Sequence, residues 1–185
     1  CTSSSFYKYT ENPYYNGQFL LWLDESNLYA KQNHPANFTW DKKIKQHIVD
    51  LSKNLPINYC IIDCGAHIGD GVIPIAAALT AYGREDIIVY AIEPDKHKIN
   101  FIKDMAIKNN LSNLRTIESG LSNDIEKYNS MVPNYDNKLK GVNSGGTFWE
   151  KTNILEVDKN KSSKYIKTIQ VFFEKLDNLV ENGTI

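Results

Sequence analysis

The chain contains 185 residues, of which 42% are hydrophobic and 23% are charged, and these proportions are typical of a globular protein. This composition excludes a disordered tail, a coiled coil and a collagen-like rod, and the length suits a single folded domain. The formal net charge of −1 offers no attraction for a phosphate backbone, so nucleic acid is not an expected partner. The longest apolar run, Val72 to Ala81, is too short for a membrane-spanning helix.

The three cysteines are Cys1, Cys60 and Cys64. The last two lie in one predicted strand, and a strand cannot easily bridge two of its own positions. We therefore expect reduced thiols and a cytoplasmic location. The histidines and cysteines show none of the spacings that are typical of zinc ligands, so the sequence predicts no metal site.

The first 56 residues are predicted to form an N-terminal arm, a hairpin and a helix. Residues 1–17 are rich in Tyr, Ser and Asn and have no clear periodicity, which indicates an irregular arm. Gln18 to Asp24 and Leu28 to Lys31 flank a polar turn. This arrangement predicts that these two segments pair as a hairpin.

Helical periodicity follows Thr39, a residue type that is favoured as an N-cap, and Pro56 marks the end of the helix. The apolar residues between them recur at steps of four, three and four, which is the spacing of one helix face. We expect this face to be buried, and it consists of Ile44, Ile48, Leu51 and Leu55.

Residues 57–185 are predicted to form a second unit in which strands and helices alternate. The expected strands are Tyr59 to Cys64, Ile87 to Ile92 and Leu114 to Glu118, each short, apolar and buried. The expected helices are Val72 to Tyr82, closed by Gly83, and a helix capped by Asp95 in which Ile99, Ile102 and Ala106 share a face. This alternation predicts right-handed crossovers and a parallel sheet of the Rossmann-like α/β class.

The remainder of the chain is less regular. Residues 122–164 are polar and weakly periodic, which indicates either a functional lid or partial disorder. Within them, Asn143 to Gly146 is interpreted either as a flexible loop at the mouth of a substrate site or as a surface turn. Thr168 to Phe173 predicts a further strand, and Leu176 to Val180 predicts a helical turn.

The turn after the first strand of the second unit carries the main candidate site, because ligands of an open parallel sheet bind beyond the carboxyl ends of its strands. This turn reads Asp63-Cys64-Gly65-Ala66-His67-Ile68-Gly69-Asp70. Its two glycines allow a close approach of the backbone to a ligand and a sharp turn into the helix. The Asp-x-Gly-x-x-x-Gly spacing differs from the pattern of most dinucleotide sites, and it lacks the Lys-Ser/Thr ending of a triphosphate loop.

Glu93-Pro94 ends the second strand, and a carboxylate in this place can accept both hydroxyls of a ribose. As the exposed end of a strand, Glu93 is expected to contribute little to folding. Two acids combined with glycines, and no basic group, fit an adenosine joined to a zwitterionic amino acid better than a pyrophosphate. Ser119 and Gly120 follow the third strand, where an adenine ring would lie.

Structural interpretations of the same residues remain open. Asp63 is interpreted either as a cofactor ligand or as a polar strand end that caps the following turn, and Glu93 either as a ribose ligand or as a solvated strand end. His67 is either a general base toward an acceptor hydroxyl or a side chain at the helix entry that only packs or donates to the backbone. The tyrosines of the N-terminal arm either stack on a sugar acceptor or another subunit, or simply pack, and they are Tyr7, Tyr9, Tyr14 and Tyr15.

Three segments, Ile61 to Asp70, Val89 to Pro94 and Asn109-Asn110, together resemble the FkbM family of S-adenosylmethionine-dependent methyltransferases. Weaker similarities extend the resemblance over roughly residues 57–185, and they are Gly120-Leu121-Ser122, Asn143 to Gly146 and Val171 to Leu179. The resemblance implies a class I methyltransferase fold, S-adenosyl-L-methionine as the cofactor, and methyl transfer to a hydroxyl of a sugar or other small-molecule or glycan acceptor.

The resemblance also implies a set of cofactor-binding residues, in which Asp63 steadies the methionine amino group directly or through water. The implied set is Asp63, Gly65, Ala66, His67, Gly69, Glu93, Pro94, Ser119 and Gly120. The chain departs from the family at His67, where the family commonly has Asn. The family also continues past a segment like Asp177 to Ile185 into a strand with an Ile-Asp-Val-Glu-Gly-like motif, so the chain is expected to be incomplete at its C-terminus.

Two other functions remain open. The first is a non-catalytic S-adenosylmethionine-binding or scaffold module on the same fold. The second is a nucleotide-sugar or nicotinamide enzyme on a related sheet, which the glycine spacing disfavours. The sequence assigns no catalytic base and no oligomeric state.

Overall fold

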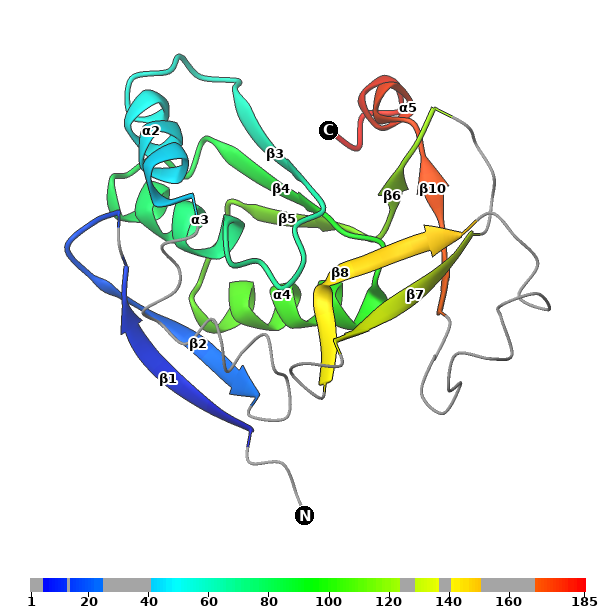
Figure 1. Cartoon of the computed structure of the whole chain (residues 1–185). Coiled ribbons are helices and arrows are strands. Elements are labelled where there is room, and N and C mark those ends of the chain that lie inside the picture. Colours follow the sequence, from blue (N-terminus) through cyan, green and yellow to red (C-terminus); the bar gives the residue numbers. More distant parts are fainter. Residues whose placement is uncertain (1–4, 13, 25–40, 124–128, 137–140, 151–168) are drawn as a thin grey trace.

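A computed structural model describes residues 5–12, 14–24, 41–123, 129–136, 141–150 and 169–185 (Figure 1). Its centre is a parallel sheet in the order β3-β4-β5, formed by β3 (Cys60–Cys64), β4 (Ile88–Ile92) and β5 (Leu114–Ile117). Helix α3 (Val72–Ala81) connects β3 to β4, and α4 (Lys96–Lys108) connects β4 to β5. The predicted parallel α/β arrangement is therefore confirmed, and it is compatible with a Rossmann-like core.

The core lies around α3, which packs against α2, α4 and the sheet. Every residue of α3 from Val72 to Leu79 is buried, as expected for a helix that is apolar on all sides. By contrast, β3 is not the buried strand that its apolar sequence predicts. Cys60 and Cys64 are exposed and the three residues between them are half-buried, because β3 lies at an edge of the described sheet.

Two helix boundaries in this region agree with the sequence. Asp95 caps α4, and its Oδ1 accepts the backbone N–H of His97 over 2.9 Å. Gly83 follows α3 with a φ of +70°, a left-handed conformation that costs glycine little and ends many helices. Ile99 and Ile102 are buried on the inner face of α4, as predicted.

Helix α2 (Lys42–Ser52) differs from its prediction in the face that it buries. Ile44 and Leu51 are 60% and 52% exposed, although both belong to the apolar stripe of the sequence. The inner face contains Lys45, Val49 and Ser52, while Ile48 and Leu55 of the predicted stripe are half-buried and pack against the same core. The helical period and half of the predicted stripe are therefore correct, but the buried face is centred part of a turn away from that stripe.

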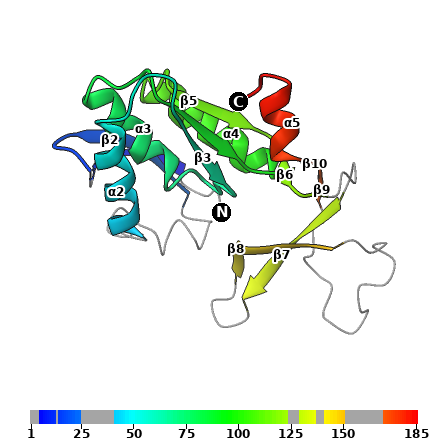
Figure 2. The ribbon, with the colours of Figure 1, turned by 90° about the horizontal axis from the view of Figure 1, so that it is seen from above.

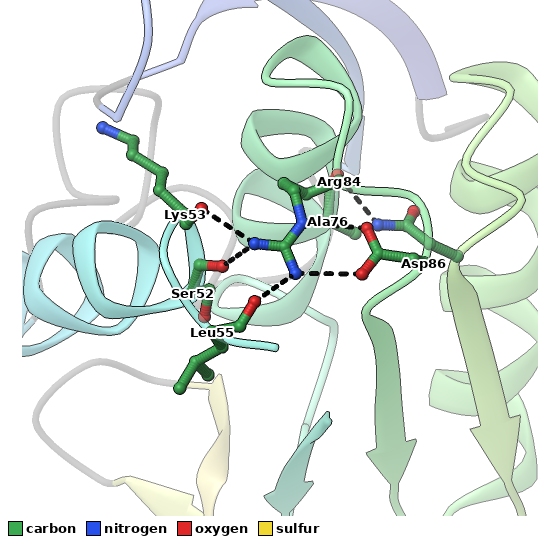
Figure 3. A network of polar contacts seen from close by, with 7 residues as sticks. Ser52, Lys53, Leu55, Ala76, Arg84 and Asp86 are labelled. Atoms are coloured by element: carbon green, nitrogen blue, oxygen red, sulfur yellow. Dashed lines mark hydrogen bonds and ion pairs between the residues drawn. The ribbon is translucent and has the colours of Figure 1, made fainter. Parts of the chain in front are cut away.

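Arg84 holds the C-terminal end of α2 (Figure 3). Its Nη1 donates to the carbonyls of Ser52 and Lys53 over 2.6 and 2.8 Å, and its Nη2 donates to Leu55 over 2.9 Å. Its Nε and Nη2 also donate to the carboxylate of Asp86. Carbonyls at the end of a helix have no partner within it, so this guanidinium ties α2 to the loop between α3 and β4.

The N-terminal hairpin pairs different segments from those predicted. Strand β1 (Ser5–Glu11) lies antiparallel to β2 (Gln18–Asp24), with Ser5 opposite Asp24 and Glu11 opposite Gln18. Residues 28–31, the predicted partner of β2, lie outside the described residues. The arm was expected to be irregular because of its polar composition, but its aromatic residues favour a strand.

The polar region after β5 contains strands where a lid or disorder was expected. Strands β7 (Asn129–Asp136), β8 (Gly141–Glu150) and β9 (Ile169–Val171) form an antiparallel sheet in the order β8-β7-β9, and β7 and β8 stand apart from the central sheet (Figure 2). Asn143 to Gly146 lies within β8, opposite a register shift in β7, so it is neither a loop nor a turn.

The C-terminal part returns to the end of β5. Strand β6 (Gly120–Leu121) pairs in parallel with β10 (Phe173–Glu174), and α5 (Leu176–Glu181) follows. The predicted strand before α5 is thus divided between β9 and β10. The predicted helical turn at Leu176 is confirmed.

Candidate functional site

The loops after β3 and β4 meet at one edge of the sheet, as predicted. Cys64 at the end of β3 is paired with Ile92 at the end of β4. The backbone N–H groups of Gly65 and Ala66 both donate to the carbonyl of Ile92, over 2.8 and 3.0 Å. The glycine-containing turn is therefore closed onto the end of β4.

The Glu93 carboxylate binds the next residue of the same turn, His67. Glu93 is only 4% exposed. Its Oε2 accepts the N–H of His67 over 3.0 Å, and its Oε1 accepts the N–H of Asp95 over 3.1 Å. Lys98 Nζ lies 3.6 Å from the same Oε1. Burial raises the pKa of Glu93, and Lys98 together with the two N–H groups opposes this rise. The expectation that Glu93 is an exposed strand end is therefore wrong, and its contacts lead us to expect that it contributes to folding.

These contacts decide what the turn can offer to a ligand. The consecutive N–H groups of Gly65, Ala66 and His67 all point to acceptors at the end of β4. A phosphate-binding nest needs such successive N–H groups to face the anion. These three N–H groups are therefore not available to a pyrophosphate.

The two glycines of the turn have different surroundings. Gly65 has a φ of +87°, and a Cβ atom there would meet no atom within 4 Å. Gly69 has a φ of +80°, but a Cβ atom there would lie 2.7 Å from Ile73 and 3.1 Å from Ile102. Gly65 thus adjoins open space that a ligand can occupy, whereas Gly69 allows close packing between α3 and α4. Ala66 is buried in the core cluster.

His67 is half-buried and has a φ of +51°. Burial lowers the pKa of its imidazole to about 3, and the positive charge of Lys98 contributes to this shift. An effective general base has a pKa near the working pH, and a neutral imidazole with so low a pKa binds a proton weakly. The structure therefore favours the packing interpretation of His67.

Asp63 lies beside two charged groups, one of which the sequence reasoning missed. Burial and the charge of Asp70 raise the pKa of Asp63, and Lys45 opposes them. Lys45 Nζ lies 3.5 Å from Asp70 Oδ2. The site was expected to have no basic group, and α2 supplies one. Lys45 lies outside the predicted apolar stripe of α2, so the periodicity does not predict that its side chain is largely buried.

Ser119 and Gly120 reach the carboxyl end of β5, but both are buried. Ser119 Oγ donates to the carbonyl of Gly120 over 2.7 Å, and the N–H of Gly120 donates to Phe172. A Cβ atom on Gly120 would lie 2.6 Å from the ring of Phe173. These contacts account for both residues by packing alone, and contact with an adenine stays a prediction. Pro94, beside Glu93, is half-buried.

A shallow cavity of about 590 Å³ lies elsewhere, between the second half of α4 and the start of β5. Lys103, Ile107 and Arg115 are among its lining residues. It is located at the amino end of β5, whereas the candidate site is at the carboxyl ends of β3 and β4. The cavity and the candidate site are therefore separate features.

Within the ranges that the structure describes, no three His, Cys, Asp or Glu side chains are arranged to hold a metal ion. No helix in these ranges has the length and apolar character needed to cross a bilayer. No protein-family model matches the chain, and a search of curated proteins finds no match.

Proposed function

We propose that this chain binds S-adenosyl-L-methionine and transfers its methyl group to a hydroxyl of a sugar or another small molecule, as the resemblance to the FkbM family implies. The observation that supports the proposal is that the N–H groups of Gly65, Ala66 and His67 all donate to acceptors at the end of β4 and not toward a ligand. With these donors consumed, the turn offers a ligand the Asp63 carboxylate and the open side of Gly65. An adenosine with an amino-acid group suits these features better than a phosphate does.

The proposal modifies the expected role of Glu93. A carboxylate has about four sites for hydrogen bonds, and three contacts already reach this one. We therefore expect Glu93 to accept at most one ribose hydroxyl, and to act mainly by holding the turn in place. Asp63 remains the proposed partner of the methionine amino group.

The sulfonium of the cofactor supplies an activated methyl group, so the protein has mainly to align the acceptor oxygen and exclude water. His67 is a poor candidate for removing the hydroxyl proton because its pKa is lowered to about 3. We assign no general base among the described residues. If binding occurs without transfer, the non-catalytic module is the better description.

Thermal unfolding of the whole chain with and without S-adenosylhomocysteine tests cofactor binding. A ligand at about 100 times its Kd stabilises the folded state by about 2.7 kcal/mol, which raises the midpoint by several degrees. Equal concentrations of NAD should produce no rise. Stabilisation by NAD but not by S-adenosylhomocysteine would overturn the proposal. Transfer of a radiolabelled methyl group to a panel of glycans and hydroxylated small molecules then distinguishes the enzyme from the module.

A further inference from the structure

Lys45 is brought to the candidate site by a helix that precedes it in the chain. Its side chain is only 12% exposed, and its Nζ lies 3.5 Å from Asp70 Oδ2. An ammonium group leaves water at a high cost unless opposite charges face it. Asp63 is within electrostatic reach as well, since Lys45 opposes the rise of its pKa. Two carboxylates and one ammonium therefore gather at the start of α3.

Gly71 leaves the space that lets these groups approach one another. A Cβ atom there would lie 3.2 Å from Asp63 Oδ2 and 3.4 Å from Lys45 Cε. The φ of Gly71 is −91°, which any residue adopts. The backbone conformation at this position therefore does not require glycine. A glycine here instead leaves room for the side chains of Asp63 and Lys45 to lie close to each other.

Tyr14 adds a polar group that the described residues leave unused. It is 3% exposed, and its hydroxyl has no hydrogen-bond partner within the described ranges. Burial raises its pKa, and the charge of Asp70 adds to the rise, so Asp70 lies within electrostatic reach of the hydroxyl. Its backbone is fixed, because its N–H donates to Asn12 Oδ1 and its carbonyl accepts from the Tyr82 hydroxyl. Buried hydroxyls are nearly always paired, which points to a ligand atom as the missing partner.

The charges of this cluster fit one part of the proposed cofactor. Asp63, Asp70 and Lys45 carry a net charge of −1, and S-adenosylmethionine carries a net charge of +1 from its sulfonium, ammonium and carboxylate groups. We propose that Lys45 and Tyr14 donate hydrogen bonds to the carboxylate of the cofactor's amino-acid portion, while Asp63 and Asp70 accept from its ammonium. This inference rests on the proposed function and assigns the N-terminal elements a direct part in cofactor binding.

Calorimetry with two ligands tests the role of Lys45. S-adenosylhomocysteine carries the amino-acid group, and 5′-methylthioadenosine has the same adenosine and sulfur without it. For Lys45→Met we expect S-adenosylhomocysteine to bind at least about tenfold more weakly, because a charge-assisted hydrogen bond is lost. The affinity for 5′-methylthioadenosine should not change. Lys42→Met, at an exposed position of the same helix, should alter neither affinity, and Lys45→Arg should retain most of the wild-type affinity.

The outcomes separate this inference from the proposed function. If wild type binds neither ligand, the proposed function fails and the inference fails with it. If wild type binds both and Lys45→Met weakens both equally, or neither, the inference alone is overturned. Should Lys45→Met fail to fold, Tyr14→Phe provides the same test. It removes a hydroxyl that has no partner among the residues the structure describes, so the unliganded chain should stay folded while the affinity for S-adenosylhomocysteine alone falls.

Discussion

The backbone N–H of His67 donates to Oε2 of Glu93 over 3.0 Å, and this bond joins the turn after β3 to the end of β4. His67 has a φ of +51°, in a region that is uncommon for residues other than glycine. Such a conformation persists only where surrounding contacts hold it. Glu93 supplies one of these contacts, so its carboxylate shapes the turn whether or not it also contacts a ligand.

Replacing Glu93 with Ala should destabilise the unliganded chain by about 2–4 kcal/mol. The substitution leaves two backbone N–H groups and the Lys98 ammonium without their carboxylate partner, and breaking a buried pair in this way is costly. Urea denaturation measures the loss. Glu118→Ala removes an exposed acid just after β5 and should change stability by less than about 0.5 kcal/mol. Equal stability of the two variants would show that Glu93 has no structural role.

The glycines of the turn should respond differently to substitution by Ala. Gly69→Ala combines a positive φ with a Cβ that would lie 2.7 Å from Ile73, so we expect a loss of at least about 2 kcal/mol. Gly65→Ala has the same kind of backbone strain but no neighbour within 4 Å, so its loss should be about 1 kcal/mol. Chemical denaturation ranks the two variants. A larger loss for Gly65→Ala would contradict the assignment of open space at that position.

The two variants should also differ in ligand binding. A methyl group on Gly65 would project into the space where the proposed cofactor lies, so Gly65→Ala should weaken S-adenosylhomocysteine binding beyond its small effect on folding. Gly69→Ala alters packing between α3 and α4 and should act mainly through stability. Calorimetry at a temperature where both variants are folded measures this difference. Unchanged affinity in Gly65→Ala would place the ligand elsewhere.

His67 should make the folded chain less stable as the pH falls. Burial and Lys98 lower its pKa to about 3, whereas an unfolded histidine has a pKa of about 6.5. Between these values the unfolded chain binds the proton and the folded chain does not, so stability declines by up to about 1.4 kcal/mol per pH unit below pH 6.5. The raised pKa values of Asp63 and Glu93 act in the opposite direction, because there the folded chain binds protons first.

His67→Asn isolates this contribution, since Asn does not titrate and tolerates a positive φ. The stability of the variant relative to wild type should rise steadily between pH 7 and pH 5 in urea titrations. A constant difference between His67→Asn and wild type at every pH would show that His67 titrates normally in the folded chain.

Arg84→Gln should loosen α2 without disturbing the sheet. The guanidinium donates to three carbonyls at the end of α2, those of Ser52, Lys53 and Leu55, and glutamine cannot reproduce this geometry. Hydrogen exchange should become faster in α2 and remain unchanged in β4. Arg115→Gln loses the bond from Arg115 to the carbonyl of Ser112 and should leave α2 protected. Unchanged exchange in α2 of Arg84→Gln would mean that other contacts hold the helix.

Much of the central fold follows from short segments of sequence. The apolar runs of β4 and α3, the Asp95 cap and the Gly83 helix end were all predicted, and the structure confirms them. Each of these features depends on groups a few residues apart, such as the Asp95 carboxylate and the His97 N–H. Local chemistry of this kind can be read directly from the sequence.

The partners of the N-terminal elements could not be predicted in this way. Residues 18–24 have the pattern of a strand, but that pattern does not say whether residues 5–11 or 28–31 pair with them. Helix α2 likewise has apolar residues on more than one side, and the contacts of Arg84 and Lys45 with distant groups orient it. Where two strand pairings or two helix orientations have similar local energies, only packing against the rest of the chain selects one of them.

In the candidate site, too, some features follow from the sequence and others only from the tertiary structure. The sequence by itself determined that Asp63, the glycines and Glu93 meet at the carboxyl ends of neighbouring strands, because the order of strands and crossovers follows from the periodicity. Only the tertiary structure decided that Glu93 faces backbone N–H groups and that Lys45 faces Asp70. The direction of a charged side chain depends on which donors and acceptors folding places around it, and these come from segments far apart in the chain.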